Sequence, residues 1–133
     1  MKNRINETFD DLSKLDKSAF VAYLCAGDPS YHKSLDSMHA LANAGADIIE
    51  VGIPFSDPLA DGIVNQLAAA RALNAGMDVK KTLELISDFR KNSNTPIVIF
   101  TYLNPIYNYG FEKFHEDASS AGVDGILILD LPP

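Results

Sequence analysis

The amino-acid sequence predicts an α/β fold with a parallel β-sheet, and two observations support this. Four short runs of branched apolar residues are nearly continuous in hydrophobicity instead of alternating with polar residues. Strands that are covered on both faces have this pattern, mainly in parallel sheets. The segments between the runs carry apolar residues at helical spacing, and parallel strands need such crossovers. The predicted order is β, α, β, α, β, α, β without a linker, so we expect residues 1–133 to belong to a single domain.

The predicted strands are residues 20–24, 48–51, 97–101 and 126–129. A further helix is predicted ahead of the first strand. There, Phe9, Leu12 and Leu15 recur at helical spacing within a polar segment. We expect this helix to plug or flank the sheet.

Each crossover contains an amphipathic helix with recognisable ends. The first lies between Asp28-Pro29 and Gly45, and its apolar stripe consists of Leu35, Met38 and Leu41 or Ala42. The second begins after Asp78, a residue type that caps helix amino ends, and its stripe consists of Val79, Leu83, Ile86 and Phe89. The third ends at Gly122, in the position of a left-handed cap, and its stripe consists of Phe111, Phe114, Ala118 and Ala121.

The turn from helix to strand is used twice. Residues 44–47, Ala-Gly-Ala-Asp, precede the second strand, and residues 121–124, Ala-Gly-Val-Asp, precede the fourth. This repeat supports the predicted alternation of helices and strands. Residues 130–133 follow the fourth strand, where a further loop and helix are expected to begin.

Composition and charge argue against several classes of function. A formal net charge of -7, a pI of about 4.7 and the lack of a Lys/Arg cluster disfavour nucleic-acid binding. No apolar run reaches the roughly 18 to 20 residues of a membrane helix, and residues 1–11 lack a signal-peptide core, so we expect a cytoplasmic protein. The single Cys25 has no partner for a disulfide or a zinc site and is expected to be a buried small hydrophobe.

Reactive groups in βα folds lie on the loops that leave the carboxyl ends of the strands. These loops are residues 26–29, 52–60 and 102–110. The second is the most unusual, because Glu50, Asp57 and Asp61 lie in or beside it with no basic residue nearby. A carboxylate at the mouth of an apolar sheet loses hydration, which favours its protonated form and lets it act as acid and base. The alternatives are a Glu50 that is solvated or paired with a distant Lys or Arg, and aspartates that only form turns.

Other residue types offer weaker candidates. Tyr23 and Tyr102, at or near strand ends, either line an apolar pocket or pack in the core or rim. His32, His39 and His115 have no metal-site spacing, so we expect three surface histidines and no metal. The sequence contains neither a nucleophile-elbow pattern nor a Gly-rich phosphate loop, which leaves covalent catalysis and nucleotide binding without support.

The second loop also carries a family resemblance. Residues 44–62 read AGADIIEVGIPFSDPLADG and resemble the signature of the tryptophan synthase alpha chain family. Residues 20–29 are similar to the family's first strand and Gly-Asp-Pro loop, and residues 102–105 and 124–132 also resemble family segments. The resemblance implies a (β/α)8 TIM barrel, of which residues 1–133 form the N-terminal half, with the first helix and about four βα units.

The resemblance also implies an activity. The family's alpha chain is a carbon-carbon lyase of tryptophan biosynthesis, which splits indole-3-glycerol phosphate into indole and glyceraldehyde 3-phosphate by a retro-aldol reaction. It uses neither a cofactor nor a metal. Its partner is a beta chain that carries pyridoxal phosphate and receives the indole, in an α2β2 heterotetramer.

Family positions assign roles to particular residues of this sequence. Glu50 matches the catalytic general acid and base, and Asp61 matches the catalytic carboxylate that stabilises the charged indole. Four residues match positions that surround the indole ring: Tyr23, Phe100, Tyr102 and Leu129. Two residues match the loop that faces the beta chain: Pro54 and Asp57.

Two departures from the family pattern bear on these expectations. The family usually continues with Asp-Gly-Pro, whereas Ile63 follows Asp61-Gly62 here, which leaves the start of the next helix open. The family's phosphate-binding loops and closing lid lie beyond residue 133, so we expect residues 1–133 alone to be inactive.

One alternative is therefore a catalytically inert half-barrel that acts as an association module. Another is a receiver-like or flavodoxin-like binding module. Such modules place their functional acids or phosphate loop after the first strand, and here that loop offers only Asp28, whose presence a helix-capping role would explain.

Overall fold

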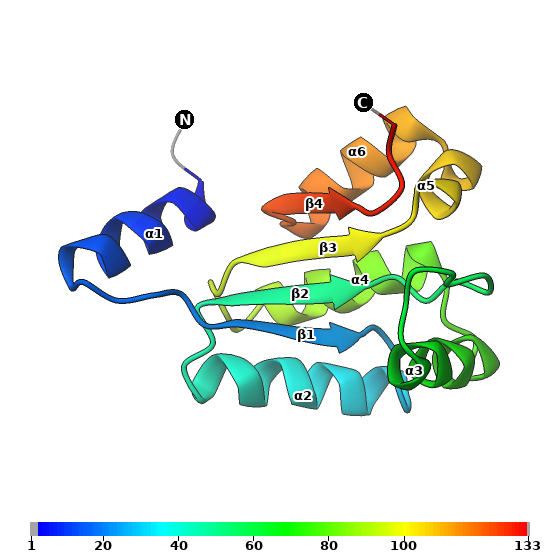
Figure 1. Cartoon of the computed structure of the whole chain (residues 1–133), viewed down its shortest axis with the longest axis horizontal. Coiled ribbons are helices and arrows are strands. Elements are labelled where there is room, and N and C mark those ends of the chain that lie inside the picture. Colours follow the sequence, from blue (N-terminus) through cyan, green and yellow to red (C-terminus); the bar gives the residue numbers. More distant parts are fainter. Residues whose placement is uncertain (1–2, 133) are drawn as a thin grey trace.

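The computed structural model describes residues 3–132. In this part of the chain, β1 (Val21–Cys25), β2 (Ile48–Gly52), β3 (Ile97–Thr101) and β4 (Gly125–Ile128) form one parallel sheet in the order β1-β2-β3-β4. The four arrows lie side by side and point the same way in Figure 1. The predicted parallel sheet is confirmed, and each strand begins and ends within one residue of its predicted bounds.

Three crossover helices pack along the sheet: α2 (Tyr31–Asn43), α4 (Val79–Arg90) and α6 (Phe111–Ala121). Asp78 caps α4 by accepting the N–H of Lys81 at 2.7 Å, and Gly122 ends α6 in the left-handed conformation with φ 84°. Both predicted helix ends are confirmed. The capping role expected of Asp28 is wrong, because the hydroxyl of Ser30 caps α2 instead.

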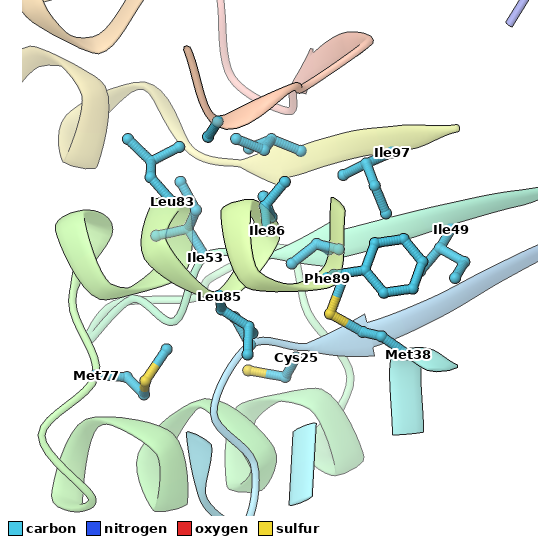
Figure 2. Close-up of a cluster of buried hydrophobic side chains, with 14 of the residues drawn as sticks. Cys25, Met38, Ile49, Ile53, Met77, Leu83, Leu85, Ile86, Phe89 and Ile97 are labelled. Carbon is cyan, nitrogen blue, oxygen red and sulfur yellow. The ribbon is translucent and has the colours of Figure 1, made fainter. Parts of the chain in front are cut away.

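The core lies between the sheet and these helices. Figure 2 shows side chains of α4 meeting residues of the strands and of α2. Ile49, Ile97, Met38, Ile86 and Phe89 are each completely buried, which is the interdigitation that the apolar stripes predict.

Two helices at the carboxyl end of the sheet were not among the predicted elements: α3 (Ile63–Asn74) and α5 (Leu103–Tyr109). The apolar residues of α3 do not form one stripe, since its buried residues are alanines while Ile63 and Val64 are exposed. The expected loop 102–110 is largely α5, a helix too short to show periodicity. Pro105 fits there because it lies in the first turn, where a helix needs no N–H donor.

The amino-terminal helix α1 (Arg4–Lys14) lies beyond the amino ends of the strands (Figure 1). Arg4 forms an ion pair with Asp124 at 2.8 Å. The Ile5 side chain lies beside the backbone of Gly125, next to Val98. The predicted helix therefore flanks the amino end of the sheet. None of the helices within residues 3–132 has the length and apolar character needed to span a bilayer.

The repeated turn has the same hydrogen bonds in both places. Asp47 exchanges bonds with the backbone of Phe20, its carboxylate accepting the N–H at 2.7 Å and its own N–H donating to the carbonyl at 2.9 Å. Asp124 does the same with Ile97, at 2.9 Å in each case. The aspartate thus fastens the start of one strand to the start of its neighbour, which explains why the repeat ends on this residue.

Candidate active site

The face of the sheet opposite α4 carries the predicted site residues. In the strand register, Tyr23 stands beside Glu50, and Gly52 stands beside Phe100. The rings of Tyr23 and Phe100 meet edge to face with centroids 5.5 Å apart. Because side chains alternate between the two faces of a sheet, these residues share one face. We call the rings of Tyr23 and Phe100 the aromatic floor, and the Glu50 carboxylate lies beside it.

Gly52 was not predicted to belong to the site. A Cβ built at Gly52 would overlap the hydroxyl of Tyr23, so the Tyr23 ring lies directly on the glycine backbone. The predicted strand stopped at residue 51 and left Gly52 in the loop, so the sequence carried no clear signal. In the structure Gly52 is the last residue of β2, where the lack of a side chain permits a close approach to the backbone. Gly52 thus makes room for the aromatic floor.

Glu50 is half-buried and is the middle residue of β2. Among residues 3–132, no side chain forms a hydrogen bond or an ion pair with its carboxylate. The alternative in which Glu50 pairs with a distant Lys or Arg is therefore not seen in this part of the chain. Its carboxylate is available to a ligand on the open face.

Asp61 lies on the loop that connects β2 to α3. Its N–H donates to the carbonyl of Pro58 at 3.0 Å, and its own carbonyl accepts from the side-chain amide of Gln66 at 2.8 Å. The hydroxyl of Tyr102 donates to Oδ2 of Asp61 at 3.1 Å and accepts the N–H of Ala60 at 3.0 Å. Asp61 takes part in the turn, but its carboxylate is turned toward the end of β3.

The carboxylates of Glu50 and Asp61 both act electrostatically on the phenol of Tyr23. Burial raises the pKa of Tyr23 well above the ordinary value of 10, and the charges of Asp61 and Glu50 add to the shift. Burial also raises the pKa of Tyr102, and the contact with Asp61 adds to that effect. The structure thus brings Glu50, Asp61, Tyr23, Phe100 and Tyr102 together on the open face, between the middle of the strands and their carboxyl ends.

The fourth predicted substrate residue, Leu129, follows β4 at the edge of the sheet. Its N–H donates to the carbonyl of Thr101 at 3.0 Å, and 38% of the residue is exposed. Val21 and Leu127 on the strands are also exposed, by 43% and 39%. The open face of the sheet therefore carries apolar side chains that are left uncovered within residues 3–132.

The two predicted interface residues differ in exposure. Asp57 is exposed and accepts a hydrogen bond from Ser56 at 2.9 Å. Pro54 is buried in this chain and lines a cavity of about 460 Å³ together with Met77 and Tyr109. Asp57 is thus open to a partner, whereas Pro54 is covered within this chain.

Asp28 and one histidine differ from expectation. Asp28 forms a two-point ion pair with Arg71 of α3, at 2.7 and 2.9 Å, which ties the first loop to α3.

His32 and His115 are exposed as predicted, but His39 is half-buried and stacks on Phe89 with ring centroids 5.0 Å apart. The expectation of three surface histidines is therefore wrong for His39.

Within residues 3–132, no group of three or more His, Cys, Asp or Glu side chains is arranged to hold a metal ion. Cys25 is buried at the end of β1, as predicted. Burial raises the pKa of its thiol to about 12, which keeps the thiol protonated at neutral pH.

Comparisons with known proteins identify the family. The family model for the tryptophan synthase alpha chain matches residues 9–133. Tryptophan synthase subunit alpha from Legionella pneumophila str. Paris is 41% identical with a TM-score of 0.97, over 100% of this chain and 51% of that chain. A tryptophan synthase from M. tuberculosis, in an aminoacrylate-bound form, is 36% identical with a TM-score of 0.93, over 99% and 54%. A tryptophan synthase complex from Pyrococcus furiosus is 45% identical with a TM-score of 0.82, over 86% and 48%.

The chain spans about half the length of the solved structures that it matches. Its four-stranded parallel sheet with crossover helices corresponds to about half of the TIM barrel of these alpha chains, which confirms the fold class expected from the resemblance. The match of the family model and the identity of 41% over the whole chain lead to one conclusion: the chain belongs to the tryptophan synthase alpha chain family, a family of tryptophan biosynthesis.

Proposed function

We propose that an intact alpha chain, with residues 1–133 as the N-terminal half of one (β/α)8 barrel domain, cleaves indole-3-glycerol phosphate to indole and glyceraldehyde 3-phosphate. The observation that carries this proposal is the pair of carboxylates at the aromatic floor. Within residues 3–132, neither Glu50 nor Asp61 forms an ion pair, and both lie close enough to Tyr23 to act on its phenol. Family membership supports the choice of substrate.

Glu50 acts as the general acid and base of this reaction. Its carboxyl group protonates the indole carbon that bears the glycerol phosphate chain, and its carboxylate accepts the proton of the neighbouring hydroxyl. As the C–O bond becomes a carbonyl, the bond between the side chain and the indole carbon breaks, and its electron pair restores the aromatic ring. The two proton transfers cancel, so no oxidant or co-reactant is needed.

Asp61 stabilises the charge that forms between these transfers. Protonation of the ring carbon makes the indole nitrogen cationic, and an anion that accepts its N–H lowers the energy of that state. The apolar floor strengthens the effect, because charges interact more strongly where water is excluded. Tyr23, Phe100 and the ring of Tyr102 would contact the indole in this arrangement.

We also propose that the alpha chain needs no cofactor of its own and docks on a beta chain that carries pyridoxal phosphate, in an α2β2 assembly. The similar protein from P. furiosus is a tryptophan synthase complex, which supports a beta-chain partner. The exposed carboxylate of Asp57 would face that partner, while buried Pro54 would hold the shape of the loop.

The test uses a protein that we call the alpha-chain chimera. It joins residues 1–133 to the part of the L. pneumophila subunit that lies outside the match, because this relative gives a TM-score of 0.97 over the shared half. Indole release and glyceraldehyde 3-phosphate formation are measured together. We expect equal amounts of both products. A folded chimera that releases neither product contradicts the proposal.

A second candidate function is association without chemistry. The exposed apolar face at Val21, Leu127 and Leu129 favours it, since such a surface is usually covered by another chain or segment. Adding residues 1–133 to the separate second half of the relative distinguishes the two functions. Binding without any indole release would favour the association module.

A further inference from the structure

The hydroxyl of Tyr102 connects the end of β3 to the loop that carries Asp61. It accepts the N–H of Ala60 at 3.0 Å and donates to Oδ2 of Asp61 at 3.1 Å. We infer that Tyr102 is a positioning residue, whose hydroxyl holds one oxygen of the Asp61 carboxylate and leaves the other free for the indole N–H. This inference rests on the proposed function, in which Asp61 stabilises the cationic indole.

The backbone of Tyr102 provides a rigid base for this contact. Thr101, the last residue of β3, donates from its hydroxyl to the carbonyl of Tyr102 at 2.9 Å. The N–H of Leu103 donates to Oδ1 of Asp130 at 2.7 Å. The Tyr102 residue is 7% exposed, and its ring packs on Phe55 with centroids 5.3 Å apart. These contacts fix the place of the hydroxyl.

The loop that carries Ala60 and Asp61, on the other side of the contact, is more exposed than Tyr102. Leu59 is 91% exposed, and Ala60 and Gly62 are also exposed. Within residues 3–132, the Tyr102 hydroxyl is the one side-chain group that forms a hydrogen bond with the Asp61 carboxylate. Without this hydrogen bond, the backbone of Asp61 still contacts the Pro58 carbonyl and the Gln66 side-chain amide, but its carboxylate is free to turn. An anion that is already oriented stabilises a transition state better, because it has no reorganisation to undergo.

Tyr102 keeps its proton under the conditions in which the site would work. Burial raises the pKa of its phenol above 10, and the hydrogen bond to Asp61 acts in the same direction. The hydroxyl therefore remains a donor to the carboxylate at neutral pH.

Tyr102→Phe in the alpha-chain chimera tests the inference, because it removes both hydrogen bonds and keeps the ring. We expect kcat to fall about tenfold to a hundredfold, the effect of losing one hydrogen bond to a charged group. KM for indole-3-glycerol phosphate should stay within about twofold, because the apolar ring is retained. Tyr31→Phe is the matched control. It removes a phenol bond to Asp88 at 2.6 Å between α2 and α4 and should leave kcat unchanged.

A double-mutant cycle with Asp61→Asn shows whether Tyr102 acts through Asp61. In the Asp61→Asn background, Tyr102→Phe should change kcat by less than about twofold, since the held carboxylate is gone. An equal loss in both backgrounds, or a change confined to KM, overturns the inference and makes Tyr102 a substrate-packing residue only.

Amide hydrogen exchange at Ala60 separates this inference from the proposed function, because it needs no turnover. Tyr102→Phe should speed exchange of the Ala60 N–H at least about tenfold, since its acceptor is lost. Unchanged exchange means that the hydroxyl does not hold the loop and overturns the inference. If Tyr102→Phe speeds exchange but Asp61→Asn turns over normally, the catalytic role of Asp61 is overturned. The positioning role of Tyr102, which depends on it, is then overturned as well.

Discussion

The ring of Tyr23 lies on Gly52, in the place that a side chain on residue 52 would occupy. The tyrosine stands on β1 and the glycine on β2, two residues beyond the register partner of Tyr23. This contact lowers the ring onto the sheet and brings it edge to face with Phe100. The aromatic floor of the site therefore depends on the absence of a side chain at residue 52.

Gly52→Ala should disturb this floor. We expect the free energy of unfolding of the alpha-chain chimera to fall by about 1 to 3 kcal/mol, the usual effect of overpacking, and KM for the substrate to rise as Tyr23 is displaced. Urea denaturation and steady-state kinetics measure the two effects. Gly62→Ala is the control, because a Cβ there meets nothing within 4 Å. Equal behaviour of the two variants would refute the packing argument.

Glu50→Gln should abolish cleavage by the alpha-chain chimera while folding and beta-chain binding remain nearly intact. The amide keeps the shape of the side chain but cannot transfer a proton. Indole release, circular dichroism and a binding titration with a beta chain measure these properties. Turnover above about a tenth of the wild-type rate would contradict the role of Glu50 as general acid and base.

Asp61→Asn should lower kcat roughly a hundredfold to a thousandfold, with a milder effect on substrate binding. This is the usual loss when one electrostatic stabiliser of a transition state is removed. Steady-state kinetics with indole-3-glycerol phosphate measure it. Asp57→Asn, a change on the same loop at an exposed residue, serves as the control for loop integrity. A change confined to KM would show that Asp61 binds the substrate but does not stabilise charge.

Asp124→Ala should be strongly destabilising, although the residue lies at the opposite end of the sheet from the site. The Asp124 side chain is 3% exposed and accepts hydrogen bonds from Arg4 at 2.8 Å, Arg90 at 2.9 Å and the N–H of Ile97 at 2.9 Å. Removing one member of a buried ion pair leaves the other charge without compensation, at a cost of about 3 to 5 kcal/mol.

Urea denaturation of the chimera measures the effect of Asp124→Ala. The control is Asp11→Ala, since the ion pair of Asp11 with Lys14 is exposed and contributes less than about 1 kcal/mol. If both variants lose the same stability, the buried network around Asp124 does not hold the sheet to α1 and α4.

Residues 1–133 as a separate polypeptide should self-associate or be loosely packed, without measurable cleavage. In the described structure, β1 and β4 each have one unpaired edge, and Val21, Leu127 and Leu129 leave the sheet face apolar and exposed. Light scattering and near-ultraviolet circular dichroism measure association and packing. A rigid monomer at high concentration would contradict the edge argument, and substrate turnover by the separate polypeptide would show that it needs no second half.

Much of the fold could be predicted from the sequence because it depends on local patterns. Apolar runs buried on both faces predicted the strands, and stripes such as that of α4 predicted the crossovers. Helices α3 and α5 were missed for local reasons as well. The alanines of α3 and the seven residues of α5 produce no clear apolar period.

The candidate site was predicted only in part. The family resemblance pointed to Glu50 and Asp61, whose catalytic roles stay predictions. The contacts of Tyr102 with Ala60 and Asp61 join residues about 40 positions apart, and no spacing in the sequence predicts them. The same holds for the ion pair of Asp28 with Arg71, which replaced the expected helix cap.

The sequence by itself determined the order of strands and crossover helices, the helix ends at Asp78 and Gly122, and the membership in a family, because each of these depends on neighbouring residues in the chain. The tertiary structure decided which side chains meet across the sheet: Tyr23 on Gly52, Tyr102 with Asp61, and Asp124 with two arginines. Such contacts depend on strand register and on the space left by other side chains. Those quantities exist only once the crossovers have placed the strands beside one another.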